Sequence, residues 1–344
     1  MLPQPVGSRY QRRIRVNPTS PRQRFLDSLT RRSRITNLGA CLLSALCTIS
    51  VLINIQNWLS STCSPNIHYH ELQLETVQRP EENQDLTHLV VVPCHSIWKG
   101  TDSWSNEDDW LLESYQRGPG RVKAFYEHIL KGVELVENDP NALLIFSGGQ
   151  TKSVSSTTEA ESYLRLAKAA GILPDGNALS SSAPFGRATT ENYALDSYQN
   201  LLFSISRFHE YTGCFPSQIT IVGYEFKRAR FEELHRTAIR WPKHLFNYLG
   251  VDPDHSYASN SRAIQGERQN GYIPYTLDRY GCHTMLIDKR RQRNRHARFH
   301  PYDTSVPELV PLLDWCPGES QSGTNTLFEG DLPWDHVTHR RESS

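Results

Sequence analysis

The chain has 344 residues, and its 37 Lys and Arg side chains are balanced by 37 Asp and Glu side chains. This balance argues against a protein that coats nucleic acid and against a disordered polyelectrolyte. The net charge of zero hides two regions of opposite charge. Residues 1–34 contain nine Arg and one acid, Asp27, so the rest of the chain carries the compensating acidic excess. We therefore expect a basic head, an acidic body and no nucleic-acid partner.

A long uncharged stretch follows the head. Its apolar centre, residues 38–55, contains no charged side chain. A helix rises 1.5 Å per residue, so this centre nearly spans a hydrocarbon layer of about 30 Å. Trp58 stands where an interfacial aromatic residue is expected. The pattern predicts a transmembrane anchor over residues 35–59 that contacts the membrane through residues 38–55.

Charge predicts the orientation of this anchor. The Arg residues precede the span, so the positive-inside rule places residues 1–34 in the cytosol and the body across the membrane. This indicates a single-pass protein of the secretory pathway, in the endoplasmic reticulum or Golgi. A mitochondrial presequence, a cytoplasm-facing body and a buried core helix remain alternatives. The long lead-in and the lack of a small-x-small cleavage site disfavour a signal peptide.

Cysteine usage leaves the compartment open. The body has an odd number of cysteines, so at most two disulfides and one free thiol are expected, and no CxxC or zinc-type spacing occurs. The sequence also lacks an N-glycosylation acceptor, which mildly weakens the lumenal assignment. No metal site is expected. The body cysteines are Cys63, Cys94, Cys214, Cys282 and Cys316.

Alternation of strands and helices predicts the fold of the body. We expect a polar stem at 60–86, a domain at 87–317 and a polar, poorly ordered tail at 318–344. Short β-branched runs alternate with helical patterns, which indicates a mainly parallel sheet covered on both faces, that is, a Rossmann-like three-layer α/β domain. The expected strands are 88–92, 142–146, 218–222 and 284–287, and the expected helices are 120–138, 158–170, 190–211 and 226–240.

Unusual residues follow three of the expected strands. Pro93-Cys94-His95 follows the first, Ser147-Gly148-Gly149 the second and Gly223–Arg228 the third. Ligands of open parallel sheets bind beyond the carboxyl ends of the strands. A Gly-Gly turn lets backbone N–H groups approach a phosphate or carboxylate, although such a turn is also a common tight connection. The turn is neither a Walker loop nor GxGxxG.

The order of these motifs resembles that of the YdcF-like family (SanA/ElyC/YdcF-type domains), in particular a membrane-anchored fungal branch. The match covers roughly residues 88–250. It includes the stretches NLLFSISRF at 200–208 and FKRARFEELH at 226–235. The matching motifs are, in order, Ser147-Gly148-Gly149, Thr158-Glu159-Ala160, Glu191 with Ser197 and Asn200, and Phe226–Arg230.

The resemblance implies a protein of uncharacterised activity that binds a nucleotide-type or other anionic small molecule. S-adenosylmethionine is one candidate cofactor. Two departures matter: Lys227 stands where the family has His, and Pro93-Cys94-His95 replaces a paired Gly. The alternative register Thr189–Asn192 is disfavoured, because Glu191 then loses the family's spacing. The implied ligand-binding residues are Ser147, Gly148, Gly149, Glu159, Glu191, Ser197, Asn200, Lys227, Arg230 and His95.

Each charged candidate also has a structural interpretation. Glu159 opens a helix, where an acid interacts favourably with the helix dipole, and Glu191 could cap a helix. Lys227 and Arg230 are three apart on one helical face and could clamp an anion or could face solvent. We treat Lys227 as a fixed point charge rather than as a switchable base. His95 is either a site residue or an ordinary loop histidine.

Two other functions remain. One is a non-catalytic membrane scaffold. The other is a glycosyltransferase whose metal-bound sugar nucleotide would be held by the triplet Asp252-Pro253-Asp254. Weaker signals are Cys94 as a nucleophile, the basic run 289–298 as a solvated loop or phosphate-contacting patch, and His296-x-x-x-His300 as metal ligands.

Overall fold

The computed structural model of the chain describes residues 21, 32–61, 83, 85–173, 185–252, 257–318 and 326–335. The chain divides into two compact units, Met1–Gln78 and Arg79–Ser344. Almost all of the basic head and most of the stem expected at 60–86 lie outside the described residues.

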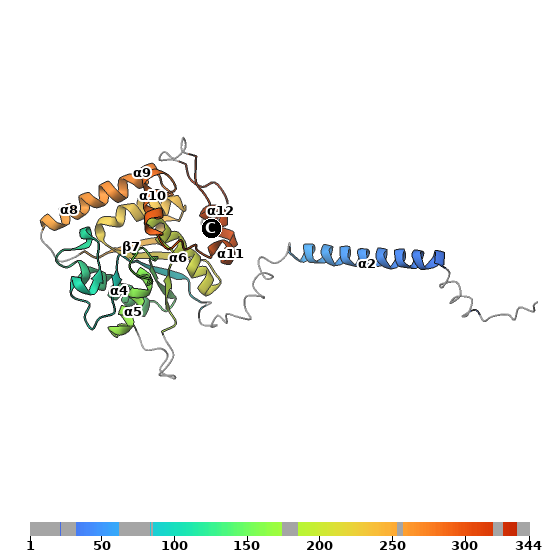
Figure 1. Cartoon of the computed structure of the whole chain (residues 1–344), viewed down its shortest axis with the longest axis horizontal. Coiled ribbons are helices and arrows are strands. Elements are labelled where there is room, and N and C mark those ends of the chain that lie inside the picture. The colour runs from blue at the N-terminus through green and yellow to red at the C-terminus, as the bar shows by residue number, and fades with distance from the viewer. Residues whose placement is uncertain are drawn as a thin grey trace, which may run out of the picture. The chain divides into compact units, whose positions relative to one another are not determined.

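The N-terminal unit contains the helix α2, Arg32–Ser61 (Figure 1). A helix over residues 38–55 is therefore confirmed as secondary structure. The described side chains within it are those of Gly39 and residues 42–56, and large apolar ones such as Leu43 and Leu46 are well over half exposed. Within the described part of the chain, no helix has the length and apolar composition needed to cross a membrane.

A five-stranded sheet forms the centre of the second unit. Its order is β5-β4-β1-β6-β7, and every neighbouring pair is parallel. The β-branched and aliphatic runs predicted as strands form its middle, where both faces are buried. The strands are β1 His88–Pro93, β4 Ala142–Ser147, β5 Ala188–Glu191, β6 Gln218–Gly223 and β7 Phe246–Gly250.

Helices cover both faces of the sheet, so the three-layer α/β architecture is confirmed. Val90 and Val92 face the helices α4, Arg121–Asn138, and α5, Glu159–Ala169, which lie together on one side (Figure 1). Leu89 and Val91 face the opposite layer, whose central helix is α6, Ser197–Thr212. Gly132 lets α4 lie against the sheet: a Cβ there would come 2.8 Å from Val92.

Helices α4 and α5 form where the sequence predicted them. The buried face of α4 carries Val122, Phe125, Ile129, Val133 and Val136, as the spacing predicted. At α5, Thr158 and Glu161 form a capping box, and Gly171 has the left-handed φ of 64° expected after the helix.

Later elements differ from the prediction. The segment expected as one helix over 190–211 begins with strand β5, and α6 starts only after the N-cap Asp196. The helix expected at 226–240 is present but is not a regular α-helix: it runs without a break through η4 Glu225–Lys227, the π-helix η5 Arg230–His235 and α7 Arg236–Ala238. The strand expected at 284–287 is wrong, because these residues open a helix, α10 Thr284–Arg293.

Short elements complete the domain. The segment 97–118 contains the antiparallel pair β2 and β3. Remaining bounds are β2 Ile97–Trp98, η2 Glu107–Asp109, β3 Trp110–Leu111, η3 Ser114–Gln116, η6 Lys243–Leu245, α8 Tyr257–Glu267, η7 Arg268–Tyr272, α9 Ile273–Leu277, α11 Tyr302–Ser305, η8 Pro307–Leu309 and α12 Val310–Leu313.

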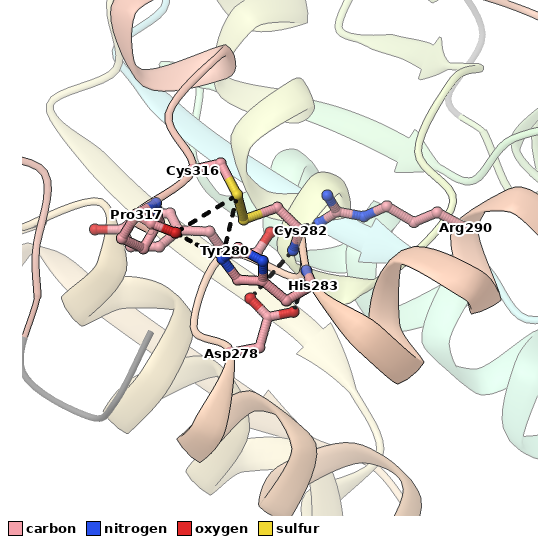
Figure 2. Close-up of a disulfide and its surroundings, with 7 residues drawn as sticks. All are labelled: Asp278, Tyr280, Cys282, His283, Arg290, Cys316 and Pro317. Atoms are coloured by element: carbon pink, nitrogen blue, oxygen red, sulfur yellow. Dashed lines mark hydrogen bonds between the residues drawn. A yellow bond between two sulfur atoms is a disulfide. The ribbon is translucent and has the colours of Figure 1, made fainter. Parts of the chain in front are cut away.

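The C-terminal region is tied to the domain covalently and by packing. Cys282 and Cys316 form a disulfide that closes a separation of 34 residues (Figure 2). The prediction of a poorly ordered tail at 318–344 is wrong for residues 326–335. Within this described segment, Phe328 and Trp334 are buried in the same core as α6. The large aromatic side chains in this otherwise polar segment account for its burial.

Candidate functional site

The connection order places a topological switch point at the carboxyl edge of the sheet. After β1 the chain adds β4 and β5 on one side, then returns to place β6 on the other side. In open parallel sheets, such a switch point separates the loops that follow the two central strands. His95 follows β1 and Lys227 follows β6, and Nδ1 of His95 lies 3.5 Å from Nζ of Lys227.

His95 is held by aromatic neighbours. Its ring stacks on Tyr224, with centroids 5.2 Å apart, and meets the edge of His128 at 5.7 Å. Burial, together with the nearby charge of Lys227, holds the pKa of His95 well below its usual range. The imidazole is therefore neutral, and its buried Nε2 has no hydrogen-bond partner among the described residues.

Lys227 brings a weakly compensated charge to the strand ends. Its ammonium lies 5.3 Å from the centre of the Tyr224 ring. No carboxylate of the described residues forms an ion pair with it. Burial, and next the charge of Arg230, lower the pKa of Lys227 to about 7. A partly buried ammonium in this setting is stabilised by any anion that reaches it.

Arg230 lies nearby but is already paired. Its Nε lies 3.2 Å from Oε1 of Glu267 in α8, and both side chains are about one-tenth exposed. A Cβ at Gly271 would come 2.4 Å from Nη1 of Arg230, so this glycine leaves room for the guanidinium. The proposed clamp of Lys227 and Arg230 therefore contains an internal carboxylate.

Glu159 comes from the first turn of α5. The residue is 8% exposed, and its carboxyl accepts a hydrogen bond from Oγ1 of Thr151. Burial raises the pKa of Glu159, while the positive charges of Lys152 and Arg293 oppose the shift. His95, Glu159, Lys227 and Arg230 are called the strand-end cluster below.

The two glycines act differently from the sequence-based expectation. The N–H of Gly148 donates to the carbonyl of Glu191 at 3.0 Å, and that of Gly149 to the carbonyl of Ala194 at 2.7 Å. These donors are not directed at a ligand, so the expected backbone cradle is wrong. Gly148 is instead required for packing, because a Cβ there would lie 2.9 Å from the Cβ of Glu159.

Three further predicted residues form a buried internal network. The Ser147 hydroxyl lies 2.7 Å from Oε2 of Glu191 and 3.0 Å from Oδ1 of Asn200. Glu191 is fully buried and also accepts from the amides of Tyr193 and Ala194 and from the hydroxyl of Tyr302. Burial raises the pKa of Glu191 to about 7. These residues join strand ends to helices, and their polar groups bind one another.

Ser197 is also bonded within the chain. Its hydroxyl lies 2.8 Å from Nε2 of His235, a buried residue of η5. Of the ten predicted residues, the structure therefore brings the side chains of four together near the carboxyl ends of the strands: His95, Glu159, Lys227 and Arg230.

Sequence reasoning missed Arg293, Glu267 and Lys152. Arg293 lies within the basic run 289–298, which was expected to be a solvated loop; its first half belongs to α10. Lys152 is 9% exposed and binds Glu113 at 2.8 Å. The signal for Arg293 was present in the alternative interpretation of that run as a phosphate-contacting patch.

The weaker candidates have local partners. Burial raises the pKa of the Cys94 thiol, which disfavours a nucleophilic thiolate. The carboxylate of Asp252 accepts the amide of Glu225 at 3.0 Å, and Asp254 lies outside the described residues.

The two histidines of the proposed pair have different partners. His296 lies 3.4 Å from the carbonyl of Lys152, whereas His300 lies 3.9 Å from Asp303.

Two other features lie apart from the strand-end cluster. Within the described chain, Cys282, His283 and Cys316 are grouped closely enough for metal ligation, but their sulfur atoms are joined in the disulfide. A hollow of about 490 Å³ shares no lining residue with the cluster. It is lined by Trp98, Gly100, Thr101, Asp102, Ser103, Trp104, Tyr126, Leu166, Ala169 and Ala170.

Comparison with known proteins identifies one relative. No protein-family model matches the chain, and no solved structure matches it. The uncharacterized protein YOR238W of Saccharomyces cerevisiae is 30% identical over 263 residues, which cover 63% of this chain and 87% of the yeast protein. The chain therefore belongs to the same family as the uncharacterized yeast protein YOR238W.

Proposed function

We propose that this chain binds an anionic small molecule at the strand-end cluster. The observation that carries the proposal is the pairing of Lys227 with His95. Lys227 has no carboxylate partner within ion-pair distance among the described residues, and the adjacent His95 presents a buried, unpartnered Nε2. An anion would neutralise the ammonium and accept or donate a hydrogen bond at the imidazole.

The position of the cluster supports the same proposal. It lies where the chain reverses its direction of strand addition, which is where open parallel sheets bind ligands. The YdcF-like resemblance remains a proposal based on motif order. Under it, the ligand is of nucleotide type, and S-adenosylmethionine is one candidate. The proposal concerns binding and assigns no reaction.

We propose that the second unit is held at a membrane by α2. The support is the uncharged apolar stretch 38–55 and the nine Arg that precede it. The disulfide supports a body outside the cytosol, because such bonds persist in oxidising compartments. We accordingly propose a protein of the secretory pathway with a cytosolic N-terminus.

Ligand-induced thermal stabilisation tests the binding proposal. Full-length protein in detergent would be heated with inorganic phosphate, citrate, adenosine monophosphate, a sugar nucleotide or S-adenosylmethionine. A ligand at 100 times its Kd stabilises the folded state by about 2.7 kcal/mol. Lys227→Met should weaken binding of the active anion about tenfold or more, because a charge-assisted hydrogen bond is lost.

Lys168→Met is the matched control, because Lys168 is an exposed lysine of α5. It should leave binding unchanged. Lack of stabilisation by every compound would contradict the proposal and favour the non-catalytic scaffold. Manganese-dependent sugar-nucleotide binding that is lost in Asp252→Ala would instead favour the glycosyltransferase.

A further inference from the structure

Helix α10 is fixed at its start by the disulfide region. Figure 2 shows Asp278 beneath the bond, where its carboxylate accepts the amides of Cys282 at 3.1 Å and His283 at 2.8 Å. Cys282 is joined to Cys316, and His283 directly precedes α10. The covalent bond and the Asp278 hydrogen bonds together fix the point from which α10 begins.

From this start, α10 carries two arginines to the carboxyl edge of the sheet. Nε of Arg290 lies 2.5 Å from the carboxylate of Asp196, and Arg293 donates to the carbonyl of Leu195 at 2.6 Å. Leu195 and Asp196 belong to the segment between β5 and α6. The preceding Ala194 binds the amide of Gly149, so Arg293 is one short loop away from the turn that contacts Glu159.

Arg293 differs from its neighbour in how its charge is compensated. Arg290 is neutralised by Asp196, whereas Arg293 forms no ion pair with a carboxylate among the described residues. The positive charge of Arg293 also lowers the pKa of both Glu159 and Lys227, in keeping with its hydrogen bond to the loop that contacts Gly149. A guanidinium has five N–H donors, and among the described residues the guanidinium of Arg293 makes one hydrogen bond, to the carbonyl of Leu195.

The charges around the strand-end cluster do not cancel. The bases here are Lys227, Arg230, Arg293 and Lys289. Burial, and next the charge of Arg293, lower the pKa of Lys289. The acids among them are Glu267, which pairs with Arg230, and Glu159. Four bases and two acids leave two positive charges when all are ionised.

We propose that Arg293 is a second anion-binding side chain of the strand-end cluster and that the ligand carries a phosphate group held by Lys227 and Arg293. This rests on the proposed function. A phosphate monoester carries a charge of about −1.5 to −2 near neutrality, which matches the uncompensated charge. The planar guanidinium suits paired phosphate oxygens. The positive sulfonium of S-adenosylmethionine is disfavoured by the same charges.

Calorimetric titration of the full-length protein in detergent with inorganic pyrophosphate tests the proposal. Arg293→Gln should weaken pyrophosphate binding at least about tenfold, as expected for one charge-assisted hydrogen bond. Arg291→Gln is the matched control, since Arg291 is exposed on the same helix and pairs with Asp288. It should change the Kd by less than about twofold, because surface pairs contribute little. Circular dichroism would verify that both variants are folded.

The outcomes separate this inference from the binding proposal. Equal binding by Arg293→Gln and Arg291→Gln, with loss in Lys227→Met, would refute the role of Arg293 and leave the anion site standing. If the protein binds citrate but not pyrophosphate, and this binding also depends on Lys227, the inference that the ligand carries a phosphate is refuted. The anion site itself would then still stand. Failure of every anion in the wild-type protein would refute both.

Discussion

Lys227 shows how burial changes the chemistry expected from a residue type. From the sequence it was a fixed point charge in place of the family's His. Its environment instead lowers its pKa to about 7, the range in which histidine usually titrates. The charge that attracts an anion is therefore switchable near neutral pH, and the expectation of a fixed charge is wrong.

Anion affinity should consequently depend on pH. The protonated ammonium binds the anion, so affinity falls as pH rises through about 7. Between pH 6 and 8 the protonated fraction, and with it the affinity for sulfate, should fall about tenfold. Sulfate is suitable because its own charge is constant over this range. Calorimetric titration at the two pH values measures the effect.

Lys227→Arg is the control for this titration, because arginine stays charged throughout. Its pH dependence should be much smaller, with any remainder due to ionisation of Glu159, whose pKa is raised by burial. A wild-type protein with equal affinity at both pH values would contradict the assignment. The depressed pKa of Lys227 also affects folding. Between about pH 7 and 10.5 the unfolded chain binds a proton at Lys227 that the folded chain does not, so the free energy of unfolding rises with pH over this range.

At the scale of elements, the disulfide is a stabilising cross-link for the C-terminal layer. Replacing Cys282 and Cys316 together by serine releases a separation of 34 residues. The unfolded chain then gains conformational freedom, and the free energy of unfolding should fall by about 2–4 kcal/mol. Urea denaturation of the double variant measures the change. Cys214→Ser is the control, because Cys214 is an exposed free thiol; an equal effect of both changes would contradict the prediction.

Local sequence patterns predicted the elements that carry their own signal. Strands β1, β4 and β6 are continuous apolar runs, and α4 shows clear helical spacing. By contrast, β5 has the sequence ATTE and pairs only because β4 presents an open edge. Its identity depends on a partner distant in sequence, which local propensity does not contain.

The residues of the candidate site could be predicted only in part, because some of them depend on contacts between distant parts of the sequence. The carboxyl ends of parallel strands converge, so His95, Glu159 and Lys227 could be grouped from the sequence. Two features of the site could be learned only from the three-dimensional structure. Gly148 uses its amide within the chain, and Arg293 contacts the loop before α6 from a helix that begins next to the distant disulfide.

For the whole molecule, topology decides which compartment supplies the ligand. If α2 anchors the protein with its N-terminus in the cytosol, a C-terminal tag in sealed microsomes should resist protease until detergent is added. The Arg excess of residues 1–34 is the physical cause, and replacing these nine Arg by Gln should reduce the protected fraction. Digestion of the tag without detergent would place the body in the cytosol. Complete extraction of the protein by carbonate would show that no membrane span exists.

The packing of Trp334 has a consequence for biosynthesis. Leu86, just before the first strand, and Trp334 belong to one continuous core. During translation, Leu86 leaves the ribosome long before Trp334 is made, so the apolar surface of α6 cannot be fully covered while the intervening residues are still being synthesised. The growing chain therefore exposes part of its core until a late stage, which is the condition under which nascent chains bind chaperones.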